Sequence, residues 1–428
     1  MPYGSGIERE VLYQNESTFA TLPAAWSSGT PFLCVDPTSE AMQQATIENM
    51  NYRQRALGTR QKVLSLANGT CGFKIYPHGR STAVAENARS TITSPNFPLA
   101  HFMQNAWGGI RLGFCAGLDG SGTQAAPAVD TGQGASFAAG DWGFFVDDTT
   151  GEGEFRKIES ISTDTLTLWD GHDLSFSPAA ADTVGAVIQA FPHTSVMVNP
   201  NNASHLTQSF LFMGDLSDDA QQGVGVKLNL AGIEGIAPGE AAMLVFEGLV
   251  TQIDNDAVSQ PSAGTPLGDA PLVVSTGDDT TVWISAVGDA LAAVEAQSIS
   301  VTPGIASQPI TGPGGLEGRH GYNLAQGSAD AAMIEVAVDY DDAWNTAFAA
   351  GTRYQILIQV GTEPGRAWGL AALNCELAED PQRGVTTDNT TSVLKFRPLE
   401  SDVSTAATGT DLEKVRAKIE ILFSCAIA

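Results

Sequence analysis

The histidines and acidic clusters of the chain are the residues that could support metal or acid–base chemistry. The six histidines include no HExxH motif and no HxH pair, which are spacings that zinc enzymes use. The densest ligand-like group, Asp-Gly-His-Asp at 170–173, is explained by a polar turn after an apolar run. Asp339, Asp341 and Asp342 lack the spacing and the closing Glu of a calcium loop, so capping of a helix is the better interpretation.

Motifs for nucleophilic and phosphate chemistry are also missing from the sequence. No GxSxG motif occurs, and the glycine-rich stretches 117–122 and 312–315 lack the Lys-Ser/Thr pair of a phosphate-binding loop. Carboxylates are plentiful, but no glycosidase-type pair can be singled out among 48 acidic residues. We therefore predict that the protein is not an enzyme and has no cofactor and no metal site.

The net charge of the chain excludes one class of binding partner. It carries 48 acidic and 21 basic residues, which give a net charge of −27. Binding to phosphate backbones depends on counterion release to Lys and Arg, so this charge excludes an ordinary nucleic-acid binder. A hydrophobic content of 43% supports a sizeable core, and 428 residues correspond to two or three domains at about 150 residues each.

The five cysteines point to a reducing compartment. Their number is odd and no CxxC pair occurs, so we predict buried free thiols at Cys34, Cys71, Cys115, Cys375 and Cys425. The first residues show neither the basic nor the apolar region of a secretory signal, and apolar runs are far shorter than the ~18 residues that span a bilayer. We expect a protein that is made and kept inside a cell, without a membrane partner.

Period-two alternation of apolar and polar residues dominates the sequence, as half-buried antiparallel strands require. Turn residues separate the alternating runs. The clearest runs cover 224–230, 334–340, 354–360 and 415–425. The pattern predicts a mainly β protein.

Two short helices are predicted beside these strands. One covers 99–107 and ends at a Gly-Gly pair; the other begins after the N-cap residue Asp341 and stops at Gly351. Their aromatic residues are best explained by packing of a helix on a sheet, and the candidates for this packing are Trp107, Trp344 and Phe348.

Four short motifs recur in the same order in the two halves of the chain, which indicates two copies of one β domain. The matched segments are 66–70 with 324–328, 73–76 with 334–337, 226–230 with 373–377, and 244–246 with 394–396. In both halves a short helix with a Trp follows the second motif.

The first half contains additional sequence, which sets the predicted domain boundaries. Short strands with tight turns between Ile110 and Gly185 have no partner in the second half and predict a small inserted β module. The predicted organisation is domain 1 at 1–110 and 185–258, the module at 111–184, a linker at 259–280, and domain 2 at 281–428.

Several segments resemble major tail proteins of long-tailed bacteriophages. At the start these are Gly-Ser-Gly-Ile at 4–7 and Asn-Glu-Ser-Thr-Phe-Ala-Thr-Leu-Pro at 15–23. In the module they are Ala-Gly-Asp-Trp at 139–142 and the run from Arg156 to Leu168. The two-copy layout resembles tail tube proteins in which one chain carries two tube domains. Type VI secretion tube proteins are similar in fold.

The resemblance implies two tandem β-sandwich or partial-barrel domains, each with a flanking helix. It also implies a structural virion protein whose rings stack into a tube, in which inner sheets merge into a β-barrel that conducts the genome. Three two-domain chains would then form a ring of pseudo-six-fold symmetry, assembled in the host bacterial cytoplasm together with other tail proteins. DNA would pass through without specific binding.

An acidic wall would repel the phosphates of passing DNA. The candidate lumen-facing residues are the polar members of two alternating runs, Glu335, Asp339, Gln355 and Gln359. A solvated outer face is the other interpretation of the same pattern.

Two further classes of function remain open from the sequence. A capsid-decorating or head–tail joining virion protein would share the β fold and the site of synthesis but would not stack. A carbohydrate-acting enzyme or adhesin would have aromatic clefts with paired carboxylates, usually with a secretion signal.

Overall fold

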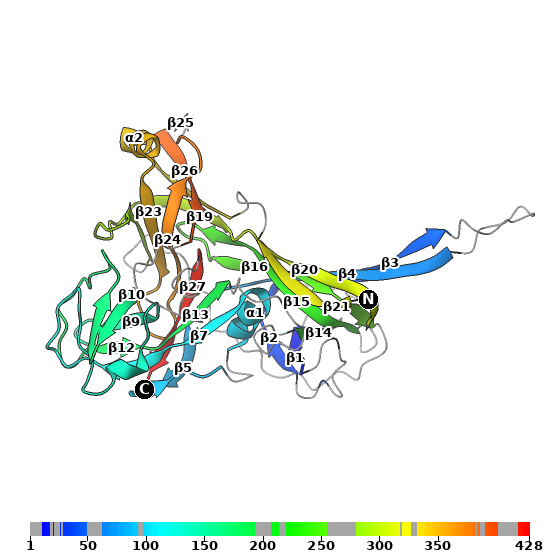
Figure 1. The fold of residues 1–428 in the computed structure, drawn as a ribbon, viewed down its shortest axis with the longest axis horizontal. Coiled ribbons are helices and arrows are strands. Elements are labelled where there is room, and N and C mark those ends of the chain that lie inside the picture. Colours follow the sequence, from blue (N-terminus) through cyan, green and yellow to red (C-terminus); the bar gives the residue numbers. More distant parts are fainter. Residues whose placement is uncertain are drawn as a thin grey trace, which may run out of the picture.

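Antiparallel strands make up most of the protein, so the predicted mainly β fold is confirmed (Figure 1). The structure is a computed structural model that describes residues 11–17, 20, 26, 29–48, 62–92, 97–192, 207–213, 220–254, 280–316, 319–326, 332–381, 383–385, 390–400 and 418–428. The motif at 4–7 and nearly all of the predicted linker 259–280 lie outside these residues.

The elements follow one another in three groups along the chain. The first group is β1 (Val11–Asn15), β2 (Thr30–Phe32), β3 (Val35–Glu48), β4 (Lys62–Ile75), β5 (Arg80–Val84), β6 (Ala88–Arg89), α1 (Pro98–Trp107), β7 (Gly108–Leu112) and β8 (Phe114–Gly117). The second is β9 (Trp142–Asp147), β10 (Glu152–Ser162), β11 (Thr165–Leu168), β12 (Thr183–Gly185), β13 (Val187–Pro192), β14 (Gln208–Met213), β15 (Ala220–Ile236), β16 (Met243–Val250) and β17 (Gln252–Asp254). The third is β18 (Thr280–Ala286), β19 (Ala296–Thr302), β20 (Ile305–Leu316), β21 (Arg319–Gln326), β22 (Met333–Asp339), α2 (Asp342–Ala350), β23 (Arg353–Val360), β24 (Trp368–Leu377), β25 (Arg383–Val385), β26 (Thr390–Pro398) and β27 (Glu420–Ile427).

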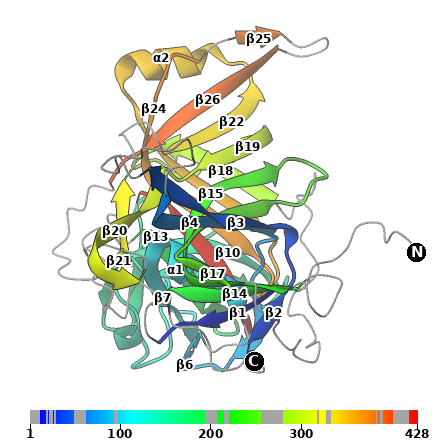
Figure 2. The same cartoon turned by 90° about the vertical axis from the view of Figure 1, so that its right-hand side faces the viewer.

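Eight strands form one continuous series of hydrogen-bonded neighbours, in the order β3–β4–β16–β15–β19–β22–β26–β24. We call β3–β4–β16–β15 the first series and β19–β22–β26–β24 the second series. The two series meet where Ile233 and Ile236 of β15 lie opposite Val301 and Ile299 of β19. Figure 2 shows β26, β22, β19 and β15 one below another, with β3 and β4 beyond β15.

The register of the first series is centred on Phe246 of β16. Phe246 lies opposite Phe73 of β4 on one side and opposite Leu230 of β15 on the other. All three side chains are buried, with exposed fractions of 2% or less. A large aromatic side chain in the middle strand is therefore enclosed by both neighbouring strands.

The second series repeats this arrangement around Phe396 of β26. Phe396 lies opposite Ile334 of β22 and opposite Leu377 of β24. The sequence motifs already match these residues. Phe73 corresponds to Ile334, Leu230 to Leu377 and Phe246 to Phe396. The two series thus share both strand order and register.

Both helices contact the aromatic residue of the middle strand. The ring of Phe102 in α1 lies 6.1 Å from that of Phe246, and the ring of Trp344 in α2 lies 6.3 Å from that of Phe396. As predicted, the Asp341 side chain caps α2 by accepting from the backbone N–H of Ala343. Gly351, at φ 65°, ends the helix.

The candidate packing residues of the two helices differ in burial. Trp107 of α1 is fully buried in the main core, and Trp344 packs against the rings of Tyr354 and Phe396. Phe348 is 36% exposed, so the prediction of sheet packing is wrong for this residue. The physical reason is that α2 rests on the sheet along one narrow side and has no fully buried residue.

The inserted module forms a sheet of its own. Among the described residues its six strands lie in the order β11–β10–β9–β12–β8–β6, so β6, from before the predicted boundary, joins it. Phe145, Ile158 and Leu166 belong to its separate hydrophobic core. In Figure 1 the module lies on the side of the molecule opposite the projecting β3–β4 hairpin.

The last strand, β27, ties the two halves together. It pairs with β13 along Ile421–Ser424 and with β24 along Glu420–Phe423. Strands of both halves also contribute to one shared hydrophobic core, which contains Phe246 and Phe396. The described halves therefore form one packed body.

Candidate functional site

Glu335 and Asp339, two of the four candidate lumen residues, lie on the face of β22 that points away from the core. The intervening residues Ile334, Val336 and Val338 are buried, whereas Glu335 is half-buried and Asp339 is exposed. Alternation along β22 therefore separates an apolar face from a polar one. The polar face is the candidate functional surface, and we call it the outer sheet face.

The lumen prediction is wrong for Gln355 and Gln359, which are buried on β23 with exposed fractions of 0% and 3%. The Gln355 amide donates to Ser285 Oγ at 3.1 Å. The Gln359 amide donates to the carbonyl of Gly153 at 2.8 Å and accepts from the N–H of Phe155 at 3.0 Å. Because the inserted module covers this face of β23, neither side chain reaches solvent.

A second hydrophobic cluster joins the module to the strands beneath it. Phe144 and Phe155 of the module pack there with Leu357 of β23 and Leu373 of β24. The apolar run from 367 to 373 indicates this contact, because a strand that is buried on both faces does not alternate between apolar and polar residues. Alternation alone does not identify this contact.

A buried ion pair lies at the edge of this interface. Lys157 of β10 lies 3.0 Å from Glu420 of β27, and both side chains are almost completely buried. The carboxylate also accepts from the Trp142 indole at 2.6 Å and from the Gln189 amide at 3.0 Å. Burial raises the pKa of Glu420, although the nearby Lys157 charge and these hydrogen bonds oppose the shift.

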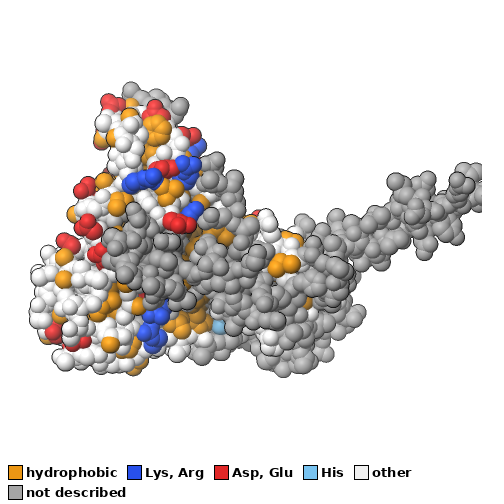
Figure 3. All heavy atoms as spheres, in the orientation of Figure 1, with side chains coloured by type: hydrophobic (Ala, Val, Ile, Leu, Met, Phe, Trp, Pro, Cys, Tyr) orange, Lys and Arg blue, Asp and Glu red, His pale blue; other side chains and the backbone are white. Residues whose placement is uncertain are grey.

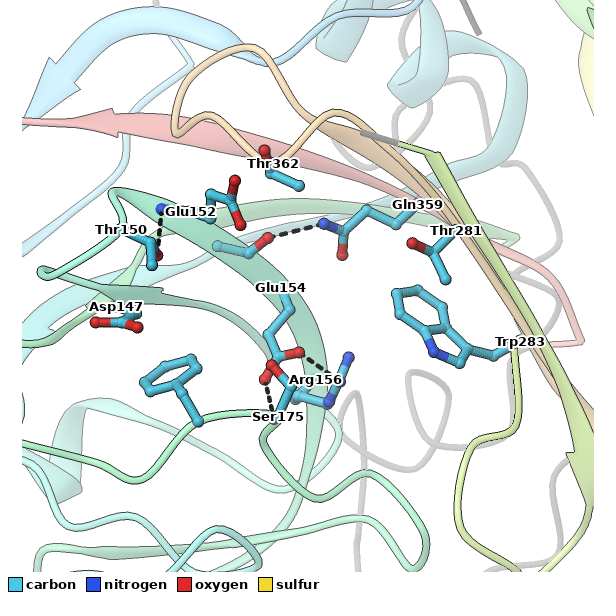
Figure 4. Close-up of a pocket in the computed structure, with 12 residues that line it drawn as sticks. Asp147, Thr150, Glu152, Glu154, Arg156, Ser175, Thr281, Trp283, Gln359 and Thr362 are labelled. Atoms are coloured by element: carbon cyan, nitrogen blue, oxygen red, sulfur yellow. Dashed lines mark hydrogen bonds and ion pairs between the residues drawn. The ribbon is translucent and has the colours of Figure 1, made fainter. Parts of the chain in front are cut away.

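A pocket of about 410 Å³ opens between the module and β18 (Figure 4). Arg156 lies on its floor, 2.6 Å from Glu154 and with its guanidinium carbon 5.3 Å from the centre of the Trp283 ring. Asp147 and Glu152 lie at the side that the module forms. The polar groups on the floor bond to one another, so the described lining offers no nucleophile paired with a general base.

The ligand-like groups of the sequence do not form a metal site. His172 is fully buried beside Lys157, and burial, followed by the charges of Arg156 and Lys157, lowers its pKa well below the usual value. Within the part of the chain that the structure describes, no three His, Cys, Asp or Glu side chains are grouped to hold a metal ion. Neither described helix is long and apolar enough to cross a membrane.

Acidic groups neutralise the basic side chains on the outer sheet face. Lys74 of β4 lies 2.9 Å from Glu234 of β15, and Lys395 of β26 lies 2.9 Å from Glu379. Figure 3 shows acidic and basic side chains side by side on the surface of the second-half strands. Glu247 on β16 adds an exposed carboxylate to the face. Lys74 and Lys395 are thus paired, and further carboxylates, including Glu335, Asp339 and Glu247, leave the described part of the face acidic.

At each end of the series one strand has an edge without a strand partner among the described residues; at the second end this strand is β25, because β24 itself pairs with β23 and β27. At one end, β3 pairs with β4 alone; at the other, β25 pairs with β26 alone, next to the end of β24. Each end carries an exposed apolar side chain, Leu33 before β3 at 54% and Val393 beside β25 at 44%. Unpaired strand edges are templates for pairing with another chain.

No protein-family model matches the sequence, and no curated protein is similar to it at a significant level.

Proposed function

We propose that this chain is a structural virion protein that self-assembles into the tail tube of a long-tailed bacteriophage. The observation that carries the proposal is the repeated series: two sets of four strands share order and register and are joined edge to edge within one chain. Such a join is head to tail, because the end of one set meets the beginning of the next. Head-to-tail contacts produce closed rings or open filaments when they are repeated between copies.

The register match favours two tandem tube domains. Phe246 and Phe396 occupy the same position in their series, and each receives a ring from a flanking helix. On this interpretation the module is an insertion in the first domain that covers the second domain. The predicted lumen then belongs to the outer sheet face and not to β23.

Ring closure would remove the two unpaired edges. A ring of three chains with eight strands each would contain 24 strands. Barrel diameter grows with strand number, and barrels of 16 or more strands leave an aqueous channel. The outer sheet face would line this channel, since the opposite face packs in the core. Its surplus of carboxylates would repel DNA phosphates.

Negative-stain microscopy of the purified full chain, combined with mass measurement in solution, tests the proposal. We expect hollow rings of three chains that stack into tubes. Single rings without stacking would favour a capsid-decorating or head–tail joining protein instead. Monodisperse monomers across a wide range of protein and salt concentration would overturn the proposal.

A further inference from the structure

We propose that the free edge of β3 in one copy pairs antiparallel with β25 of a second copy, with Cys34 opposite Gly384. This inference rests on the proposed function and names the surface through which the copies meet. The join between the two series inside the chain provides the template, because it already pairs the same two kinds of edge.

The template is the antiparallel contact of β15 with β19, in which Ile236 lies opposite Ile299. Ile236 belongs to the last strand of the first series, and Ile299 belongs to the first strand of the second series. The corresponding contact between copies would join β25, which continues the position of β24 along β26, to β3, the first strand of the first series.

Cys34 occupies the position of Ile299. In the second series Ser300 lies opposite Glu335 and Ile299 opposite Val336. In the first series Val35 lies opposite Lys74, the position that corresponds to Glu335, so the preceding residue, Cys34, corresponds to Ile299. Cys34 and Ile299 also have similar surroundings, because Ile299 belongs to the main core and Cys34 packs against that core.

Gly384 occupies the position of Ile236. In the first series Glu234 lies opposite Met243, and continuing this register by two residues brings Ile236 opposite Ala241. Gly384 of β25, which follows β24 along β26, lies opposite Thr391. Thr391 corresponds to Ala241, because both lie five residues before the aromatic centre of their strand.

Among the described residues, β3 pairs with β4 alone and β25 pairs with β26 alone, so each has one edge without a strand partner. Gly384 is exposed, and a Cβ atom there would lie 3.3 Å from Thr391 Oγ1, a contact that a small rotation of the Thr391 side chain about χ1 relieves. Leu33 and Val393, the exposed apolar residues at the two ends, would lie near the new contact and lose water contact on pairing.

The test uses Gly384→Cys in the full chain, with Cys34 as the natural partner. Directly opposed residues of antiparallel strands have Cα atoms about 4.5–5.5 Å apart, within the range that a disulfide spans. After oxidation with copper–phenanthroline, we expect most of the assembled chain to run as covalent dimers and trimers without reductant. Cross-linking should drop at least tenfold in the Cys34→Ser/Gly384→Cys variant.

Two further variants keep the test decisive. Val287→Cys places an exposed thiol directly after β18, outside both edge strands, and should give no ladder. Val35→Cys/Arg383→Cys probes the neighbouring position of the same register if Gly384→Cys does not fold. Rings without a cross-link in either edge pair would overturn the β3–β25 contact and leave the proposed function standing. A folded chain that forms neither rings nor cross-links would overturn both.

Discussion

The Nζ atom of Lys157 lies 3.0 Å from Oε1 of Glu420, although 263 residues separate the two along the chain. Lys157 belongs to the inserted module, and Glu420 begins the strand that joins the two halves. Nζ also lies 5.7 Å and 5.4 Å from the rings of Trp142 and Trp169. Because the site is buried, neither charge has water as an alternative partner, so the pair fixes the module at one position.

Lys157→Met should reduce the free energy of unfolding by about 3–5 kcal/mol, since it leaves the Glu420 carboxylate buried without a counter-charge. Lys157→Met/Glu420→Gln should recover a large part of this loss, because the neutral amide oxygen still accepts from Trp142. Urea denaturation of the single and double variants measures both effects. A loss below 1 kcal/mol in Lys157→Met would show that the pair does not hold the module.

The same pair shows how far the sequence could predict the fold. Alternation identified β22 and its two faces, and the capping residues located α2, because these are local properties of neighbouring residues. In the alternating run 415–425 Glu420 lies on the polar face, yet the structure buries it. A local pattern cannot show that a partner 263 residues away covers that face.

The candidate site also contains residues that the sequence could place and residues that it could not. Glu335 and Asp339 could be placed on a polar strand face from spacing alone, whereas Gln355 and Gln359 have the same spacing and lie under the module. The difference is set by tertiary packing of the module on β23, through contacts with residues such as Phe155. The repeat could be recognised in the sequence as short motifs. The two strand edges without a described partner could be identified only from the strand pairing in the structure.

Lys227→Met should stabilise the protein at neutral pH by an amount on the order of 3 kcal/mol. Lys227 is fully buried and donates to the carbonyl of Asn105, and burial lowers its pKa from 10.5 to about 7. A shift of this size corresponds to about 5 kcal/mol, from which the lost hydrogen bond subtracts about 1–2 kcal/mol.

The pH dependence of the Lys227 variant gives an independent check. Between pH 7 and 10.5 the unfolded chain holds a proton on Lys227 that the folded chain releases, so wild-type stability should rise with pH in this window. Lys227→Met should remove that rise in thermal unfolding curves. Lys74→Met, at an exposed ion pair, should change stability by less than about 1 kcal/mol. An unchanged pH slope in Lys227→Met would contradict the prediction.

Phe246→Ala and Phe396→Ala should each reduce the free energy of unfolding by about 3–5 kcal/mol, since each leaves a cavity at the centre of its series. Both rings are buried, with exposed fractions of 1% or less. Phe348→Ala, at a 36% exposed position, is the control and should change stability by less than about 0.5 kcal/mol. A large loss in one series and a loss below 1 kcal/mol in the other would argue against equivalent positions.

Glu335→Lys/Asp339→Lys should convert the proposed channel from one that repels DNA into one that retains it. Both acids lie on the outer sheet face, and the double change replaces two negative charges by two positive ones in each chain. We expect short duplex DNA added during tube assembly to be retained and protected from nuclease in the variant but not in the wild type, with retention falling steeply as salt rises. Asp148→Lys/Glu152→Lys adds the same charge on the module, so any DNA that it binds should stay open to nuclease. Equal nuclease protection in the two variants would place Glu335 and Asp339 outside the channel, because position and not net charge is the difference between them.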